Sequence, residues 1–194
     1  MPLPIGHSLM SYALYETISK EKLRPSWRML LLFILVANLA DFDFIPGFLL
    51  GEPHKFHRLF ISHSLGGSVL VGFVFAVCVW ISKKEKFVFY FLIFTGVYFS
   101  HVLLDFFNSD YSAPYGVPLF WPFSNEYVMS PVPIFMAIEK SGHGVEFIKS
   151  LFIKHNILAA LWEAIVFILI LTIIKLVKNR KIFFRFAFNR DANE

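Results

Sequence analysis

Residues 87–107, FVFYFLIFTGVYFSHVLLDFF, form an apolar run in which His101 and Asp105 are the only ionisable residues besides two tyrosines. At about 1.5 Å per residue, a helix of this length crosses the roughly 30 Å hydrocarbon core of a bilayer. His101 and Asp105 stand four residues apart near its end, so they share one face of the helix. The stretch therefore predicts a membrane-spanning helix that carries an imidazole and a carboxylate side by side.

The composition extends this prediction to the whole chain of 194 residues. It is 57% hydrophobic, with 25 phenylalanines and a mean hydropathy of +0.62. Only 16% of its residues are charged, whereas about 25% is typical of soluble proteins. The net charge of +4 lies in short blocks beside apolar runs, which indicates membrane topology and no nucleic-acid partner. The expected fold is all-α, a polytopic membrane helical bundle of four to five transmembrane helices.

Four other apolar segments complete the expected bundle, at about residues 5–19, 27–46, 62–82 and 156–177. The first is short and partly polar, so it is either shielded inside the bundle or lies at the membrane interface. We expect residues 1–181 to form one membrane-embedded helical domain and residues 182–194 a basic cytoplasmic tail.

One long loop, about residues 108–154, is expected outside the cytoplasm. Its prolines alternate with aromatic residues, and this content favours packing over a functional site rather than disorder. The strip LFWPFS at 119–124 is interpreted as an interface anchor or a lid.

Lys and Arg residues predict the orientation. Of the 18, 13 fall in three blocks between or after the apolar segments: Lys20, Lys22, Arg24 and Arg28; Lys83, Lys84 and Lys86; Lys175, Lys178, Arg180, Lys181, Arg185 and Arg190. Positively charged loops stay in the cytoplasm. We therefore expect a multi-pass protein of the cytoplasmic (inner) membrane with its C-terminus in the cytoplasm.

On this topology, acids and imidazoles from separate segments reach one level near the outward face. They are Asp41, Asp43, His57, His63, His101, Asp105 and Glu163, together with His7 if the first segment crosses the membrane. Ionisable residues at membrane depth are costly and indicate function by default. Carboxylates packed together repel one another, and a divalent cation relieves that repulsion. The sequence therefore predicts a metal site facing outward, with zinc favoured and manganese or magnesium as alternatives.

Each of these residues also has a plainer interpretation. His101 and Asp105 alone would be a local hydrogen-bonded pair, and His57 or His63 would merely lie at the start of a helix. Asp41 and Asp43 either end a helix among lipid headgroups or, in extended backbone, point the same way with Phe42 opposite.

Two further residues leave alternatives open. Glu163 is a ligand, a general base or a buried glutamate bonded across the bundle. Arg58 either holds a phosphate-type oxyanion or pairs with Asp41 or Asp43.

The ordered set of motifs resembles the YdjM-like family of inner-membrane metal-dependent hydrolases over nearly the whole chain. More distantly, it is similar to the zinc-dependent phospholipase C and P1 nuclease group, although the chain lacks that group's His-x-x-x-Glu pair. The motifs are His7, Asp41-Phe42-Asp43, His57-Arg58, His63-Ser64, His101-x-x-x-Asp105 and FWPF at 120–123. The resemblance implies metal ligation by His7, Asp41 or Asp43, His57 or His63, His101 and Asp105.

The leading functional hypothesis is a membrane-bound metal-dependent hydrolase that acts on a phosphoester, with lipid or a small molecule as substrate. Asp43 or Glu163 would take the proton from water, and Arg58 would steady an anionic substrate. One alternative is an ion or proton-coupled transporter, although the cytoplasmic halves of the later segments are almost purely apolar. Another is a non-catalytic membrane protein with a structural metal.

Overall fold

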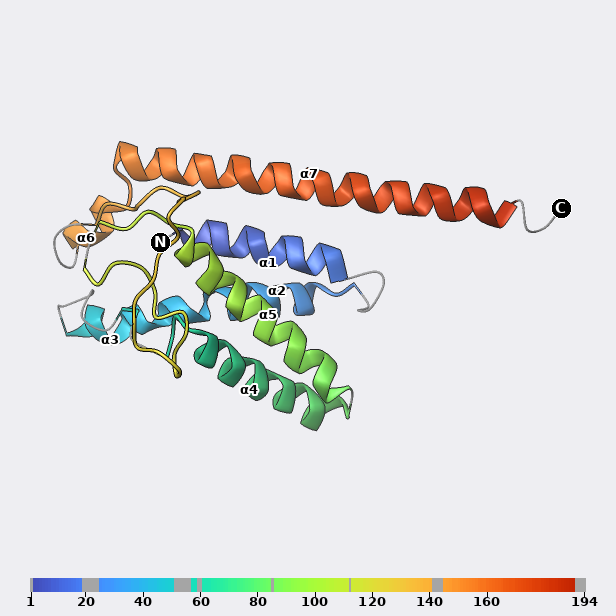
Figure 1. The fold of residues 1–194 in the computed structure, drawn as a ribbon, viewed down its shortest axis with the longest axis horizontal. Coiled ribbons are helices and arrows are strands. Elements are labelled where there is room, and N and C mark those ends of the chain that lie inside the picture. Colours follow the sequence, from blue (N-terminus) through green and yellow to red (C-terminus); the bar gives the residue numbers. More distant parts are fainter. Residues whose placement is uncertain are drawn as a thin grey trace.

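The apolar runs fold into helices in the computed structural model, which describes residues 2–18, 25–50, 57–58, 61–84, 86–111, 113–140 and 145–190. Figure 1 shows the long helices running along a common direction. In chain order the elements are α1 (Pro4–Ile18), α2 (Trp27–Asn38), the 3₁₀ helix η1 (Leu39–Asp43), α3 (Phe44–Leu49), α4 (Leu65–Lys83), α5 (Phe87–Phe106), α6 (Val145–Ser150) and α7 (Lys154–Arg190).

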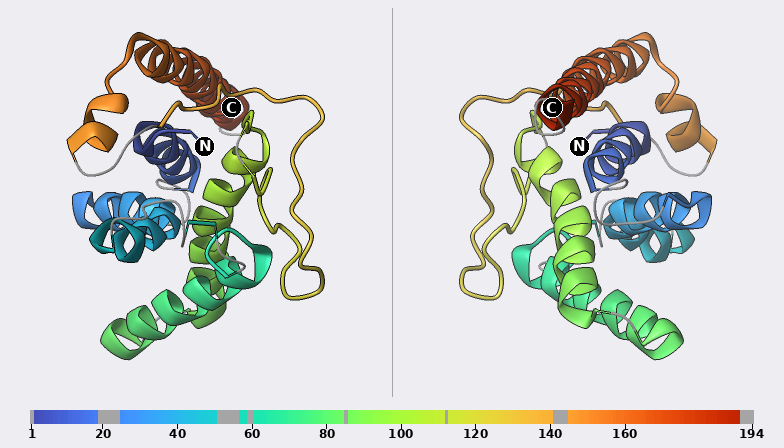
Figure 2. Two further views of the ribbon diagram at one scale, coloured as in Figure 1. Left: turned by 90° about the vertical axis from the view of Figure 1, so that its left-hand side faces the viewer. Right: turned by 90° about the vertical axis from the view of Figure 1, so that its right-hand side faces the viewer.

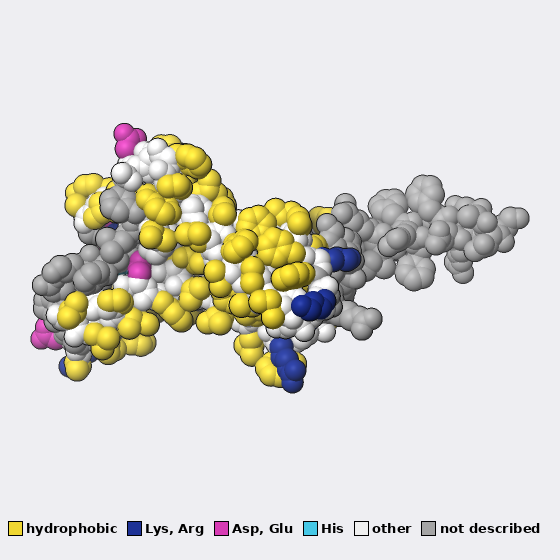
Figure 3. Space-filling model, turned by 90° about the horizontal axis from the view of Figure 1, so that it is seen from below, with side chains coloured by type: hydrophobic (Ala, Val, Ile, Leu, Met, Phe, Trp, Pro, Cys, Tyr) yellow, Lys and Arg dark blue, Asp and Glu magenta, His cyan; other side chains and the backbone are white. Residues whose placement is uncertain are grey.

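Four helical stretches are long and apolar enough to cross a membrane: Trp27–Gly47, Leu65–Lys83, Phe87–Phe106 and Lys154–Lys178. The first combines α2, η1 and the start of α3. Many large apolar side chains on these stretches are exposed, as expected where lipid replaces water as the solvent, and Figure 3 shows them spread over the visible face. The prediction of an all-α polytopic membrane protein is confirmed.

Helix α1 is shielded inside the bundle. It packs against α2, α5 and α7, and in the end-on view of Figure 2 it lies between α7 and α2. Its buried residues are Gly6, His7, Ser11, Ala13 and Tyr15. With 15 residues it is not among the four candidate spans, yet this position brings His7 into the protein interior.

A glycine sets the distance between α4 and α5, the most extensively packed pair of helices. A Cβ atom at Gly72 would lie 2.0 Å from Thr95 Oγ1 and 2.7 Å from Thr95 N. Small residues allow such close approach of helices in a membrane. Gly72 thereby lets α5 pack tightly enough to position His101 and Asp105 at its far end.

The two ends of the bundle differ in character. Figure 1 places α3, α6, the N-terminus and the segment between α5 and α6 at one end, and the α4–α5 connection at the other. At the latter end Tyr15 Oη bonds the backbone of Ser26, and Lys178 Nζ donates to the Glu16 carbonyl. Most Lys and Arg side chains visible in Figure 3 lie toward this end. The predicted basic residues Lys20, Lys22 and Arg24 lie outside the described residues.

The segment between α5 and α6 packs against the bundle, as its aromatic content predicted. Figure 2 shows it passing along the outside of α5. The carbonyls of Leu119 and Trp121 each accept a hydrogen bond of 2.9 Å from the first turn of α4, while Phe123 is 86% exposed. The strip at 119–124 thus covers the start of α4. At the other end of the chain, α7 continues to Arg190, so the expected boundary at residue 181 falls inside a helix.

Candidate metal centre

Seven of the predicted ligands come together at one end of the bundle. His7 comes from α1, Asp41 and Asp43 from η1, and His101 and Asp105 from the last turns of α5. The turn before α4 supplies the two others, His57 and His63. The elements that supply them are far apart in the sequence, so only the tertiary fold can assemble this cluster.

Five of these side chains surround one point in the interior. Asp105 Oδ2 lies 3.1 Å from His63 Nε2 and 3.5 Å from His101 Nε2. The same two imidazole nitrogens are 3.2 Å apart. His7 Nε2 lies 3.7 Å from Asp105 Oδ1, and Asp41 Oδ1 lies 3.7 Å from His101 Nε2. All three imidazoles are fully buried, so water does not compete for these nitrogens.

The outer nitrogen of three imidazoles is held by a fixed partner. His101 Nδ1 donates to the Ala37 carbonyl at 2.7 Å. Asp43 holds the two others, with 2.8 Å to His57 Nδ1 and 3.3 Å to His63 Nδ1. In His101 and His63 this leaves Nε2 turned toward the centre. Metal-binding histidines are commonly oriented in this way, by a carboxylate or carbonyl on the second nitrogen.

The two aspartates of η1 diverge, which corrects the extended backbone considered for them. A 3₁₀ helix has about 3 residues per turn, so alternate residues point to different sides. Asp41 faces the centre, whereas Asp43 contacts the outer nitrogens. Asp43 Oδ2 also accepts hydrogen bonds from Ser62 Oγ at 2.7 Å and from the Arg58 backbone N–H at 2.8 Å. Asp43 therefore orients these imidazoles.

Unsatisfied polar atoms test whether a cation fits. Buried groups are normally hydrogen-bonded, but among the described residues both ring nitrogens of His7, Oδ1 of Asp41 and both oxygens of Asp105 have no hydrogen-bond partner. Two sets of ligand atoms lie within 4.8 Å of one another: His7, His101 and Asp105, and Asp41, His57 and His63. These imidazoles and carboxylates could hold a divalent metal ion.

The carboxylates around His63 favour a positive charge at this point, either a proton or a bound cation. Burial disfavours the charged form of His63, but three close carboxylates raise its pKa well above the usual value. The carboxylates are those of Asp105, Asp41 and Asp43. Burial lowers the pKa of His57 to about 4 against its bond to Asp43, which keeps its imidazole neutral, the form that binds metals.

The Arg58 side chain pairs with an acid other than the two considered for it. Its guanidinium pairs with Asp110, 52 residues away, and donates to the Gly116 carbonyl at 2.9 Å. Its backbone adopts φ = 60°, which non-glycine residues seldom do. The hydrogen bonds from its N–H to Asp43 and from Tyr127 Oη to its carbonyl hold this conformation.

Glu163 lies in α7 beside the start of α1. Its Oε1 accepts a 2.9 Å hydrogen bond from the Leu3 N–H, and a Cβ atom at Gly6 would lie 2.6 Å from its Oε2. Among the alternatives left open for Glu163, the structure shows a buried glutamate bonded across the bundle. It fixes the helix that carries His7.

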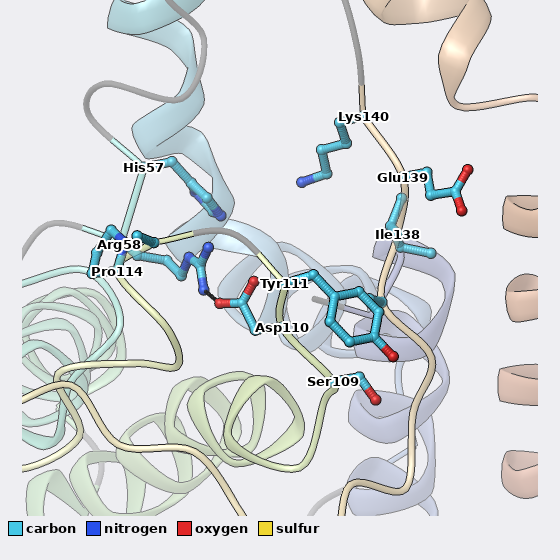
Figure 4. A pocket seen from close by; sticks show the side chains of 11 residues that line it. His57, Arg58, Ser109, Asp110, Tyr111, Pro114, Ile138, Glu139 and Lys140 are labelled. Carbon is cyan, nitrogen blue, oxygen red and sulfur yellow. Dashed lines mark hydrogen bonds and ion pairs between the residues drawn. The ribbon is translucent and has the colours of Figure 1, made fainter.

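A pocket of about 480 Å³ opens beside the cluster. Figure 4 shows His57 and Arg58 on one side of it and Lys140 on the other. His57 thus lines the pocket and also belongs to the cluster. Sequence reasoning did not identify Asp110, Lys140 or Ser62 as part of the site. Asp110 and Lys140 have no local signal, whereas Ser62 stands next to His63 in the sequence.

Comparison with known proteins gives one match. Residues 1–182 match the family model described as YdjM inner membrane protein. No curated protein and no solved structure matches the chain. Since the match covers nearly the whole chain and includes every cluster residue, this membrane-embedded protein belongs to the YdjM inner membrane protein family.

Proposed function

We propose that the protein is a metal-dependent hydrolase that acts on phosphoesters at the membrane surface. The observation that carries the proposal is a buried set of imidazoles and carboxylates with unsatisfied inward atoms, directly beside an open pocket. A purely structural metal would not need a pocket at its edge. His57 lies between the two, which suits chemistry on a molecule bound in the pocket.

The ligands proposed for the metal are His7, Asp41, His57, His63, His101 and Asp105. A divalent cation, with zinc favoured and manganese or magnesium as alternatives, would supply Lewis-acid activation of water and of a phosphoryl oxygen. Asp43 and the Ala37 carbonyl orient the imidazoles, so they keep the ligand set in place without reorganisation.

The proton acceptor is reassigned. Asp43 accepts bonds through both of its oxygens and Glu163 holds the start of α1, so both are proposed as positioning residues. Asp105 has two buried oxygens without a hydrogen-bond partner among the described residues. One oxygen can hold the cation while the other accepts a proton from the attacking water.

The location supports a substrate at the membrane surface. The cluster and the pocket lie at the end of the bundle that holds α3, α6 and the long packed segment (Figure 1). Asp41, Asp43, His101 and Asp105 lie near the ends of their apolar spans. We propose that they meet the lipid headgroups there. The basic residues at the opposite end support an outward-facing site in the inner membrane.

Hydrolysis of a phosphodiester probe by detergent-purified protein tests the function. Asp105→Asn removes a ligand charge, and kcat/KM should fall about 100-fold, since metal catalysis supplies several kcal/mol. Glu146→Gln on α6, an exposed acid outside the cluster, is the matched control and should retain full activity. Metal-loaded wild-type protein with no activity, or Asp105→Asn with full activity, would contradict the proposal.

A further inference from the structure

Lys140 lies across the pocket from His57 and Arg58. In Figure 4 its side chain extends toward His57, and its ammonium lies 4.5 Å from the centre of the Phe44 ring. Phe44 in turn stacks on His57 at 3.8 Å. A cation over an aromatic face is favourably placed. The Lys140 charge is thus positioned one ring away from a candidate metal ligand.

The backbone around Lys140 is fixed to the start of α7. Asn156, fully buried, accepts a 2.9 Å hydrogen bond from the Glu139 N–H and donates one of 2.7 Å to the Glu139 carbonyl. His155 Nε2 donates to the Ala137 carbonyl at 2.8 Å. These bonds hold the backbone at Ala137 and Glu139, so the position of Lys140 in the pocket is organised before any ligand enters.

The second cation of the pocket has a different task. The Arg58 guanidinium pairs with Asp110 and bonds the Gly116 carbonyl, which ties the turn carrying His57 to the long packed segment. Arg58 therefore supports the pocket wall. Lys140 lies on the other side, and lysine binds phosphate as a compact point charge.

We propose that this pocket binds the phosphate group of the substrate and that Lys140 is its main cationic contact. The proposal deepens the hydrolase function above and rests on it. Ligand pockets commonly enclose about 300–1,000 Å³, and the 480 Å³ here suits a phosphorylated headgroup or a small phosphoester. His57 at the inner edge would bring that phosphate next to the metal centre.

Calorimetric titration of glycerol phosphate into the full-length protein in maltoside detergent tests the site, with metal content matched between variants. Lys140→Gln should weaken binding about tenfold, and Lys140→Arg should restore most of it, because the contact is charge-assisted. Lys149→Gln, an exposed lysine of α6, is the control and should bind as wild type does. Equal affinity of wild type and Lys140→Gln, or no binding by wild type, overturns the proposal.

The activity assay separates this site from the hydrolase function. If both hold, Lys140→Gln raises KM for the phosphodiester probe and leaves kcat and metal content near the wild-type values. Binding that depends on Lys140 in a protein that hydrolyses nothing upholds the site and overturns the function alone. A fall in metal content of Lys140→Gln overturns the assignment to substrate binding.

The same titration in nanodiscs distinguishes two sources of the phosphate. With phosphatidylglycerol in the disc, a lipid headgroup in the pocket would compete and weaken glycerol phosphate binding relative to maltoside. Unchanged affinity would identify a soluble phosphoester as the ligand. Either result agrees with phosphate recognition by Lys140 if Lys140→Gln weakens glycerol phosphate binding in maltoside. Where the lipid competes, Lys140→Gln should also remove the difference in affinity between maltoside and nanodiscs.

Discussion

Asp43 shows how one carboxylate organises several ligands. It holds the outer nitrogens of His57 and His63, and it accepts bonds from Ser62 and the Arg58 backbone. The sequence placed Asp43 in the cluster correctly but could not assign its role, since that depends on which nitrogen each imidazole turns toward it. An orienting residue of this kind typically matters 10–100-fold for metal affinity.

Replacing Asp43 tests that role at the residue scale. Asp43→Asn keeps the side-chain shape but removes the charge that holds two imidazole N–H groups, so zinc affinity should fall about 10–100-fold. Competition with a chromogenic chelator measures the change. Glu139→Gln, a nearby exposed acid outside the cluster, should leave affinity unaltered. If zinc affinity fell as far in Asp43→Asn as in Asp105→Asn, Asp43 would instead be a direct ligand.

At the scale of elements, helix positions were predictable and their junctions were not. Apolar length located α4, α5 and the membrane part of α7, because lipid-facing helices need long uninterrupted apolar runs. The 3₁₀ helix between Asn38 and Phe44 has no comparable signal, since α and 3₁₀ turns use similar residues. The orientation of Asp41 and Asp43 depends on that local backbone.

The contact between α4 and α5 provides a test with an internal control. Gly72→Val would force its side chain against Thr95, and overpacking should destabilise the protein by about 1–3 kcal/mol or more. Gly96→Val on α5 makes the same chemical change where no atom lies within 4 Å of the added Cβ. Thermal unfolding in detergent should show a lower Tm for Gly72→Val alone. Equal Tm shifts for both variants would rule out the close approach as the cause.

At the scale of the whole molecule, topology predicted the level of the cluster. Once alternate helix ends are assigned to one side, the cluster residues lie at one level there, and the packing of the helices brings them together. The pairing of Arg58 with Asp110 and the placement of Lys140 were not predictable, since both depend on how an irregular segment of the chain folds back. Its path is fixed by backbone bonds that leave no periodic pattern in the sequence.

Orientation in the membrane is a prediction at this scale. In a Cys78→Ser background, which removes the single cysteine, Tyr111→Cys should react with a membrane-impermeant maleimide on intact cells. Tyr111 lies at the end with the pocket and is 81% exposed. Lys83→Cys, exposed at the opposite end, should react only after lysis. The reverse pattern would place the site in the cytoplasm.

Metal analysis of purified protein tests the central claim most directly. Wild-type protein loaded with zinc and then desalted should retain stoichiometric metal, and His101→Ala should lose it because that imidazole faces His63, Asp41 and Asp105. His155→Gln, a change to a histidine outside the cluster, should retain metal like wild type. A wild-type protein that holds no zinc, or a His101→Ala variant that holds as much as wild type, would contradict a metal centre at this site.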